Sequence, residues 1–403
     1  MKLRPLFILL AVLTLSATVR SAPGTLIPRP QEATRLDGQF VFTTGIPVVY
    51  ASGLEPLAEY IADYIPLQRL DDRTWTAGAA LRLSLDGTMD DESYRLTVTP
   101  QGVQVVGADY GGVFNGLQTL LQLLPPEVYT GQATLPLTVD ACRIEDAPRF
   151  HYRGMMLDVV RTWMDADRVK RHIDLLSHLK INKLHLLLSN DEGWRLEIKS
   201  HPELTEIGAW RGGDSPVMPV YGKWDEKYGG FYTQDEMRDL IRYAAVRNVE
   251  IIPELDLPGH SRNFARVHPE ILCDYTPDLR PTAGYDYRSV WCASREENYR
   301  LLADILGELA ALFPSEYLHI GGDEVDMSQW EKCPNCRVLM AREGMADGHA
   351  LEQYFLGRLT RILEANGKRP AVWNEAIEGG ELARSTRVHG WESVKACLDA
   401  TAA

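Results

Sequence analysis

The stretch DADRVKRHIDLLSHLKINKLHLLL, residues 165–188, decides the fold. Its first part predicts a helix over residues 165–180, because apolar residues recur three or four positions apart and so share one face. The residues of that face are Val169, Ile173, Leu176 and Leu179. Its last part, Lys183–Leu188, is a short apolar run, typical of a strand buried on both faces. A helix followed by such a strand indicates a parallel sheet.

The same alternation continues on both sides of this stretch. Further strands are expected at Gly154–Val159, Glu250–Leu255, Tyr317–Ile320, Ala371–Trp373 and Arg387–Trp391. Further amphipathic helices are expected at 233–247, 295–313 and 351–366. Residues 149–403 are therefore predicted to form an α/β domain of the (β/α)8 TIM-barrel type, of which the sequence supplies about six strands.

Local signals mark several helix ends in this region. Thr233 with Glu236, and Ser294 with Glu297, have the spacing of a capping box. Gly367 follows the last of these helices and is a plausible stop signal.

Residues 23–148 have a different pattern and predict a small α+β accessory domain. Tyr94–Thr99 and Val103–Val106 alternate apolar and polar residues around a Pro-Gln-Gly turn, which indicates a hairpin. Gly111–Leu124 has helical periodicity. No cluster of His, Cys or carboxylate residues suggests a site in this domain.

Residues 1–22 have the pattern of a signal peptide. Lys2 and Arg4 precede the apolar run Leu6–Leu15, which small residues follow. The run is too short for a transmembrane helix, which needs about 20 apolar residues. We expect an exported protein, either periplasmic or secreted.

The composition is that of an ordinary globular protein. The 403 residues are 45% hydrophobic and 24% charged, and 42 Lys and Arg stand against 56 Asp and Glu, a net charge of −14. This sign disfavours nucleic acid and anionic membranes as partners. A neutral or basic ligand is favoured.

The six cysteines are at positions 142, 273, 292, 333, 336 and 397. In an oxidising compartment some of them should pair, and the first candidate is Cys273 with Cys292, because they bracket a turn-rich stretch. Cys333 and Cys336 have the spacing of a metal knuckle or a redox pair. Without a second knuckle or a nearby His pair, a local disulfide or two free thiols are favoured over a metal or redox role.

In parallel barrels, chemistry takes place at the carboxyl ends of the strands. The polar and aromatic residues expected there are Asp158, Arg161, Asn190, Asp191, Glu254, Asp256, His260, Asp323, Glu324, Trp373, Glu375, Trp391 and Glu392. Acids and tryptophans suit sugar chemistry, because flat rings stack on pyranose faces and carboxylates stabilise an oxocarbenium-like transition state. The set contains no phosphate cradle, no Ser/His/Asp triad and no convincing metal cluster. No cofactor and no metal are implied, and calcium in a loop stays an unsupported alternative.

The most specific segment is His319-Ile-Gly-Gly-Asp-Glu-Val325. Two adjacent carboxylates cannot flank a glycosidic bond as nucleophile and acid, so one of them must do something else. The segment resembles glycoside hydrolase family 20, the β-N-acetylhexosaminidases. The resemblance implies that Glu324 is the acid/base and that Asp323 orients the substrate's 2-acetamido group, whose oxygen is the nucleophile.

Separate motifs extend the resemblance from about residue 25 to the last residue. Leu157–Arg161 is similar to the family's first-strand motif, and Gly193–Ile198 with Leu204–Arg211 to the loop after the second strand. Pro253–His260 resembles the third-strand motif. The resemblance implies that His260 tunes the acid/base. It also implies substrate-binding residues: Arg161 for the sugar hydroxyls, Asp191, and Trp373 and Trp391 as walls of the N-acetyl pocket.

Two departures concern residues 185–191, which read His-Leu-Leu-Leu-Ser-Asn-Asp. Leu187 replaces a family His, and Asn190 replaces the Asp that the resemblance assigns to support of the active-site His. An amide can accept a hydrogen bond from His260 but brings no charge. We therefore expect poorer tuning of Glu324, an altered pH profile, and a gain of activity from Asn190→Asp.

A third departure is that the sequence given stops at Ala403, before a seventh and an eighth strand. Open sheet edges predict aggregation, pairing with another chain or failure to fold. The favoured function is exo-acting hydrolysis of terminal N-acetyl-β-hexosamine from oligosaccharides or glycoconjugates by a substrate-assisted retaining mechanism. The alternatives are a catalytically inactive, truncated relative that retains at most sugar binding, and a barrel hydrolase with a carboxylate nucleophile. The oligomeric state stays open.

Overall fold

The structure is a computed structural model that describes residues 25–213, 225–273 and 289–402. The chain divides into two compact units, Met1–Arg149 and Phe150–Ala403. The segment interpreted as a signal peptide, residues 1–22, lies outside the described residues. None of the helices in the described part of the chain has the length and apolar character of a membrane span.

The first unit is built on a mixed seven-stranded sheet. Its order is β1 (Glu32–Phe42), β7 (Leu137–Asp146), β5 (Tyr94–Thr99), β6 (Gly102–Gly107), β4 (Leu81–Leu85), β2 (Pro47–Tyr50) and β3 (Gln68–Asp71). The predicted hairpin is confirmed: β5 and β6 are antiparallel, with Thr99 opposite Gly102. The helices α1 (Glu55–Tyr64) and α2 (Tyr110–Leu123) contact each other and this sheet, and the short helix η2 (Pro126–Thr130) follows them.

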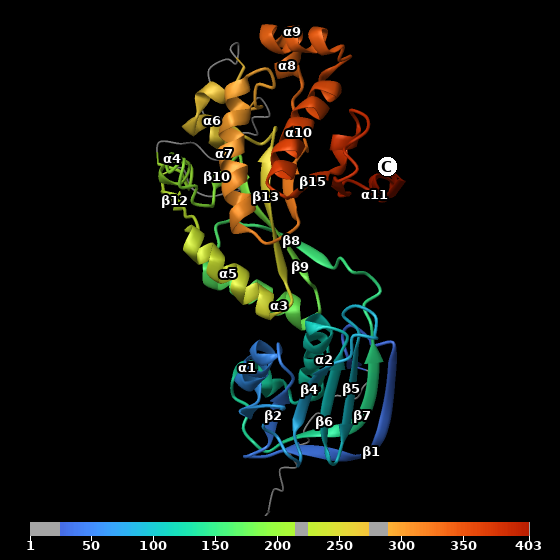
Figure 1. Ribbon diagram of the computed structural model, residues 1–403. Helices are drawn as coiled ribbons and strands as arrows, with labels where there is room; N and C mark the ends of the chain where they lie inside the picture. Colours follow the sequence, from blue (N-terminus) through green and yellow to red (C-terminus); the bar gives the residue numbers. More distant parts are fainter. Residues whose placement is uncertain (1–24, 214–224, 274–288, 403) are drawn as a thin grey trace, which may run out of the picture. The chain divides into compact units, whose positions relative to one another are not determined.

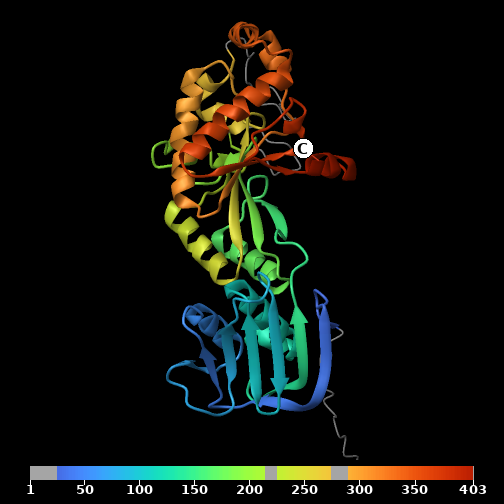
Figure 2. The ribbon, with the colours of Figure 1, turned by 45° about the vertical axis from the view of Figure 1, so that its right-hand side comes forward.

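The second unit contains a curled parallel sheet that forms a partial barrel (Figures 1 and 2). The six predicted strands are confirmed. They are β8 (Gly154–Asp158), β9 (Lys183–Asn190), β13 (Glu250–Leu257), β14 (Tyr317–Gly321), β15 (Arg369–Trp373) and β16 (Arg387–His389). They are neighbours in sequence order, as in a TIM barrel, and the short β10 (Gly193–Trp194) adds antiparallel to β9.

Four helices contribute the outer part of the core. They are α3 (Ala166–His178), α5 (Gln234–Val246), α7 (Glu296–Leu312) and α10 (Gly348–Ala365), and α7 and α10 pack side by side (Figure 1). The large apolar cluster joins their buried faces to alternate strand residues such as Leu184, Leu186 and Leu188. The residues between these point to the inside of the curl, because side chains alternate along a strand.

Two of the expected helix-end signals are present. Thr233 and Glu236 form the complete capping box of α5. Gly367 follows α10 with a φ of 72°, the left-handed region that suits a helix stop.

The second predicted capping box is wrong. The N-cap of α7 is Arg295, and it makes no side-chain cap hydrogen bond. The hydroxyl of Ser294 instead lies 3.2 Å from the sulfur of Cys292.

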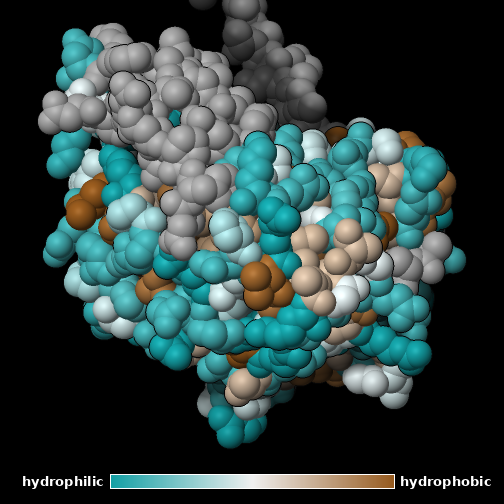
Figure 3. Space-filling view, turned by 90° about the horizontal axis from the view of Figure 1, so that it is seen from above, coloured by the Kyte–Doolittle hydropathy of each residue, from teal (hydrophilic) through white to brown (hydrophobic). Residues whose placement is uncertain are grey.

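Long connections follow several strands and carry short elements. These are α4 (Glu203–Glu206), β11 (Trp210–Arg211), β12 (Tyr228–Gly229), α6 (Arg262–Val267), η4 (Pro269–Ile271), α8 (Ser328–Lys332), α9 (Pro334–Glu343), η5 (Asn374–Ile377) and α11 (Val394–Ala402). Viewed from above, the described surface is mainly hydrophilic, and its apolar side chains form small separate patches (Figure 3).

The curled sheet has two open edges. Within the described residues, β8 pairs only with β9 and β16 only with β15. Met155 and Met156 on β8 are 43% and 38% exposed. The predicted open edges are therefore present at β8 and β16. Aggregation of the protein, or its pairing with another chain through these edges, stays a prediction.

The expected disulfide between Cys273 and Cys292 is absent. All six cysteines lie in the described part of the chain, and each has a free thiol. The physical reason is that both sulfurs belong to a four-sulfur cluster in which Cys336 is their neighbour.

Candidate active site

The carboxyl ends of β9, β13 and β14 bring the central acidic residues together. Asp191 follows β9, and His260 follows β13 after a short turn. Asp323 and Glu324 follow β14 after two glycines. Residues far apart in sequence meet here because parallel strands end at the same edge.

The first of the two glycines, Gly321, allows a close approach between β14 and β13. Gly321 and Gly322 have φ of 73° and 93°. A Cβ on Gly321 would lie 2.4 Å from Asp256 Oδ1 and 2.6 Å from the backbone nitrogen of Leu257. Because glycine has no Cβ, Asp256 can come this close to the backbone of β14.

Glu324 and His260 both have a left-handed backbone, with φ of 49° and 42°. For residues with a Cβ such conformations cost of order 1–3 kcal/mol and persist only where the surroundings enforce them. The Glu324 N–H donates to Glu375 Oε2 at 2.5 Å, which helps to hold its backbone.

His260 lies at the centre of the site. Its Nδ1 is 2.8 Å from Asp191 Oδ2, and its Nε2 is 3.1 Å from Glu324 Oε2 and 3.7 Å from Asp323 Oδ2. Its side chain is only 2% exposed. Burial alone would lower its pKa, but the hydrogen bond and charge of Asp191, with the charge of Asp323, raise the pKa of His260 to about 9. The imidazole is therefore charged at neutral pH.

The premise behind the prediction for Asn190, that the support of His260 carries no charge, is wrong. Asn190 Nδ2 donates to Asp256 Oδ2 at 2.7 Å, and Asn190 Oδ1 accepts from the Asp191 N–H at 2.8 Å. The carboxylate beside His260 comes from Asp191. The negative charge that stabilises the imidazolium is thus present, supplied by the next residue in the chain.

This also corrects the role expected for Asp191. We predicted substrate binding, but Asp191 Oδ2 is taken by His260, and Asp191 Oδ1 accepts from the Arg262 N–H at 3.0 Å. Its side chain is 5% exposed. Asp191 is therefore a positioning residue for His260.

The buried Asp256 and the partly buried Asp323 form a pair of acids. Burial, followed by the charge of Asp323, raises the pKa of Asp256 far above its usual value. Burial also raises the pKa of Asp323, to about 6, although the charge of His260 opposes this rise. One proton on Asp256, donated to Asp323, leaves Asp323 with the charge.

Arg161 lies at the end of β8 and contacts two acids. Its Nη1 is 2.9 Å from Asp158 Oδ2, and its Nε is 3.6 Å from Glu192 Oε2. Its side chain is 26% exposed, so it is only partly buried. Glu192 is not among the residues predicted for the site. The sequence feature that could have identified it is its position directly after Asp191.

The buried Arg195 fixes the backbone beside Arg161. It is fully buried, and it donates to the carbonyls of four residues: Val159, Val160, Ala209 and Gly230, at 2.6 to 3.1 Å. Arg211 Nη2 donates to the carbonyl of Arg161 at 2.6 Å. The loop after β9 thus acts as a support for the loop that carries Arg161.

The two predicted tryptophans have different surroundings. Trp373 Nε1 donates to Glu254 Oε1 at 2.8 Å, and its ring stacks on His185 with centroids 5.4 Å apart. Glu254 is fully buried, and although burial opposes this, His319 and His185 hold its pKa far below the usual range. Trp373 is therefore anchored in the barrel interior, whereas Trp391 is 50% exposed.

Asp256 and Glu375 are among the residues expected at strand ends, but no role was predicted for either of them. Glu375 accepts from the Glu324 N–H, and burial is the main cause that raises the pKa of Glu375 to about 7. The site thus combines several acids, only some of them ionised at neutral pH, with two cations, His260 and Arg161. Such a site favours a positively charged transition state next to a proton donor.

Comparisons with known proteins agree with this geometry. The family model "Glycosyl hydrolase family 20, catalytic domain" matches residues 150–403, and "Glycosyl hydrolase family 20, domain 2" matches residues 24–147. A beta-hexosaminidase of Vibrio furnissii is 39% identical over 384 residues, 94% of this chain and 61% of the relative. A beta-hexosaminidase of Porphyromonas gingivalis is 36% identical over 91% of this chain and 47% of its own length.

A solved structure is also similar. It is the exo beta-N-acetylglucosaminidase from Vibrio harveyi in complex with N-acetylglucosamine, with a TM-score of 0.85 and 35% identity. The match covers 95% of this chain and 60% of that chain. The present chain thus spans about half to three fifths of the length of these relatives.

Proposed function

This chain belongs to glycosyl hydrolase family 20, and from that premise we propose that it releases terminal non-reducing N-acetyl-β-hexosamine by substrate-assisted retaining hydrolysis. The substrates would be oligosaccharides or glycoconjugates that carry this sugar. One observation carries the proposal: His260 joins Asp191 to Glu324 beside the partly buried Asp323.

In the first step, Glu324 gives its proton to the leaving glycosidic oxygen. The acetamido oxygen of the substrate forms a bond to the anomeric carbon as the bond to the leaving group breaks. Asp323 accepts the acetamido N–H and balances the positive charge of the resulting oxazolinium ring. This division of labour accounts for two adjacent carboxylates, because neither has to attack the sugar from the opposite face.

In the second step, a water attacks the anomeric carbon and gives its proton to Glu324. The ring opens, and the configuration of the sugar is retained. The charged His260 can donate through Nδ1 to Asp191 and through Nε2 to Glu324, so it fixes the orientation of the acid/base.

Substrate binding is assigned to residues at the rim. Arg161 has five donors on a planar guanidinium, and a partly exposed Arg at a strand end suits the hydroxyls of a terminal sugar. The half-exposed ring of Trp391 and the anchored ring of Trp373 would stack on the sugar or its acetamido group. The basic and apolar N-terminal segment supports export to the periplasm or the medium.

The test is hydrolysis of a chromogenic aryl N-acetyl-β-glucosaminide by the purified chain, beside the variant Glu324→Gln. We expect the variant to lose about 10² to 10⁴-fold in kcat/KM, the usual range for a general acid/base. Glu331→Gln, at an exposed position on α8, is the matched control and should keep full activity. Unchanged activity in Glu324→Gln would contradict the assignment.

The alternative is a relative that binds sugar without hydrolysing it. The observation on its side is that β8 and β16 each pair with one strand within the described residues, whereas a barrel site is normally built from eight strand ends. A folded chain that binds N-acetylglucosamine but leaves the aryl glycoside intact would establish this alternative.

A further inference from the structure

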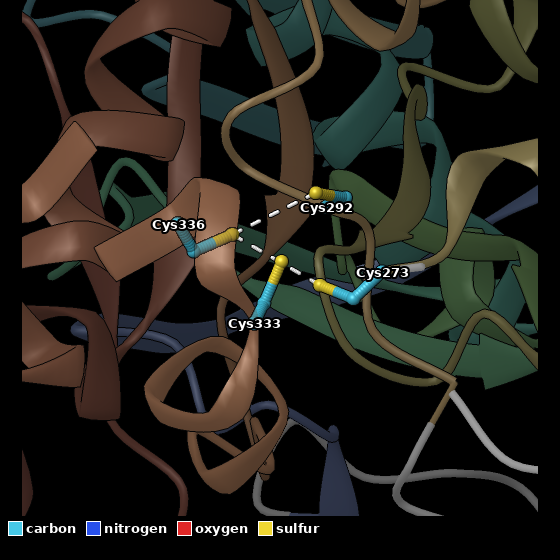
Figure 4. Close-up of side chains that lie close together, drawn as sticks. All are labelled: Cys273, Cys292, Cys333 and Cys336. Atoms are coloured by element: carbon cyan, nitrogen blue, oxygen red, sulfur yellow. Dashed lines mark hydrogen bonds between the residues drawn. The ribbon is translucent and has the colours of Figure 1, made fainter. Parts of the chain in front are cut away.

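Four buried cysteines meet in the connections beyond β13 and β14 (Figure 4). Cys273 follows η4, and Cys292 lies next to the bridge between Leu272 and Trp291. Cys333 lies between α8 and α9, and Cys336 lies in the first turn of α9. All four are between 0% and 3% exposed. The cluster shares no residue with the group formed by Asp256, His260 and Asp323.

The spacing of the sulfurs fits four ligands around one ion. Cys336 Sγ is 3.6 Å from Cys292 Sγ and 3.9 Å from Cys273 Sγ, and all four sulfurs lie within 4.8 Å of one another. Zinc–sulfur bonds of about 2.3 Å in a tetrahedron place the sulfurs about 3.8 Å apart. A disulfide would need about 2.05 Å.

We propose that Cys273, Cys292, Cys333 and Cys336 bind one Zn²⁺ ion in a structural site. Four thiolates in a tetrahedral arrangement favour zinc among the common divalent ions. A fully buried four-cysteine set leaves no open position for a substrate, which is typical of structural rather than catalytic zinc.

Neighbouring polar groups can hold the four cysteines in place, as a structural zinc site needs. Ser294 Oγ is 3.2 Å from Cys292 Sγ and 3.6 Å from Cys336 Sγ, within reach of a hydroxyl-to-thiolate hydrogen bond. This contact accounts for the failure of Ser294 to cap α7. Asn298 Nδ2 donates to the carbonyl of Cys292 at 3.0 Å, which fixes the backbone of that ligand.

The ion would cross-link two connections that serve the active site. One runs from His260 to the start of α7 and contributes Cys273 and Cys292, and the other follows Glu324 and contributes Cys333 and Cys336. Zinc binding adds to folding free energy, because the unfolded chain holds no preformed site. Loss of the ion should therefore destabilise the second unit, whether or not the chain is a hydrolase.

The experiment is elemental analysis of the purified chain, with thiol titration before and after chelation under denaturing conditions. We expect one zinc per chain and four thiols that react only after chelation. Cys333→Ser and Cys336→Ser should each reduce zinc to below half an equivalent and lower Tm by roughly 10 °C. Cys142→Ser is the matched control, because Cys142 is buried in the first unit, and it should keep the full zinc content.

A second measurement does not depend on the variants folding. The intact chain, exchanged with Co²⁺, should show the visible absorption of tetrahedral cobalt thiolate. A metal-free chain with two disulfides, a metal-free chain with four reactive thiols, or a chain loaded with iron would each overturn the zinc assignment. None of these outcomes bears on hydrolysis of the aryl glycoside, so the two proposals fail separately.

Discussion

Asp191→Asn removes the negative charge beside His260 but keeps an oxygen that can accept the same hydrogen bond. The pKa of His260 is raised from 6.5 to about 9. At about 1.36 kcal/mol for each pH unit, this corresponds to roughly 3 kcal/mol in favour of the imidazolium. Asp191 is the main cause that raises this pKa, so the variant should bring it down by roughly 1 to 2 pH units.

The stability effect has a definite sign. A histidine whose pKa is higher in the folded state stabilises the fold fully below its unfolded pKa of 6.5, and this contribution is lost as pH rises through about 9. The imidazole is buried, so solvent screens this interaction little. The difference in free energy of unfolding between the parent and the variant should therefore be largest below pH 6.5 and smallest above pH 9.

Two assays check this reasoning. An NMR titration of the His260 ring gives its pKa directly, and denaturant unfolding on both sides of the titration gives the stability difference. If the protein is active, the alkaline limb of kcat/KM should move to lower pH by the same amount. Asp239→Asn, at an exposed position on α5, is the control. A His260 pKa that stays near 9 in the variant would refute the account.

Three further predictions follow from the site. Asn190→Asp adds a carboxylate to the pair formed by Asp256 and Asp323, so we expect at least a tenfold loss in kcat/KM and a lower Tm. A gain in activity would contradict the geometry. Arg195→Met leaves four buried carbonyls without their donor, so the free energy of unfolding measured with denaturant should fall by about 3 kcal/mol or more. A fall of less than about 1 kcal/mol would contradict this reasoning. Because the charged form of Asp323 exists only above its pKa of about 6, kcat/KM should fall as pH drops below that value, and an acid limb far from pH 6 would count against the role of Asp323.

The sequence predicts the strands and helices of the second unit well, because each of them has a buried face and periodicity reports that face. The strand Lys183–Leu188 is recovered as β9, two residues longer at its end. The capping signal at Ser294 failed for a tertiary reason. Its hydroxyl has two sulfurs as neighbours, and one of them, Cys336, comes from a distant part of the chain.

The sequence identifies the acidic residues of the site but not the contacts that position them. The motif around Asp323 and Glu324 identifies the acids, and the structure adds the partners that position them. The exchange of roles between Asn190 and Asp191 could not be foreseen, because neighbouring side chains on a strand end point to different sides and only the tertiary structure decides which reaches His260. The four-cysteine cluster was missed for a similar reason, since its second pair does not have the spacing of a knuckle.

The central claim is that the acetamido group of the substrate, rather than a protein carboxylate, is the nucleophile. The direct test is the ratio of kcat/KM for an aryl N-acetyl-β-glucosaminide to that for the matching aryl glucoside with a 2-hydroxyl. We predict hydrolysis of the acetamido substrate alone. Comparable hydrolysis of both substrates would contradict it, because it would require a carboxylate nucleophile.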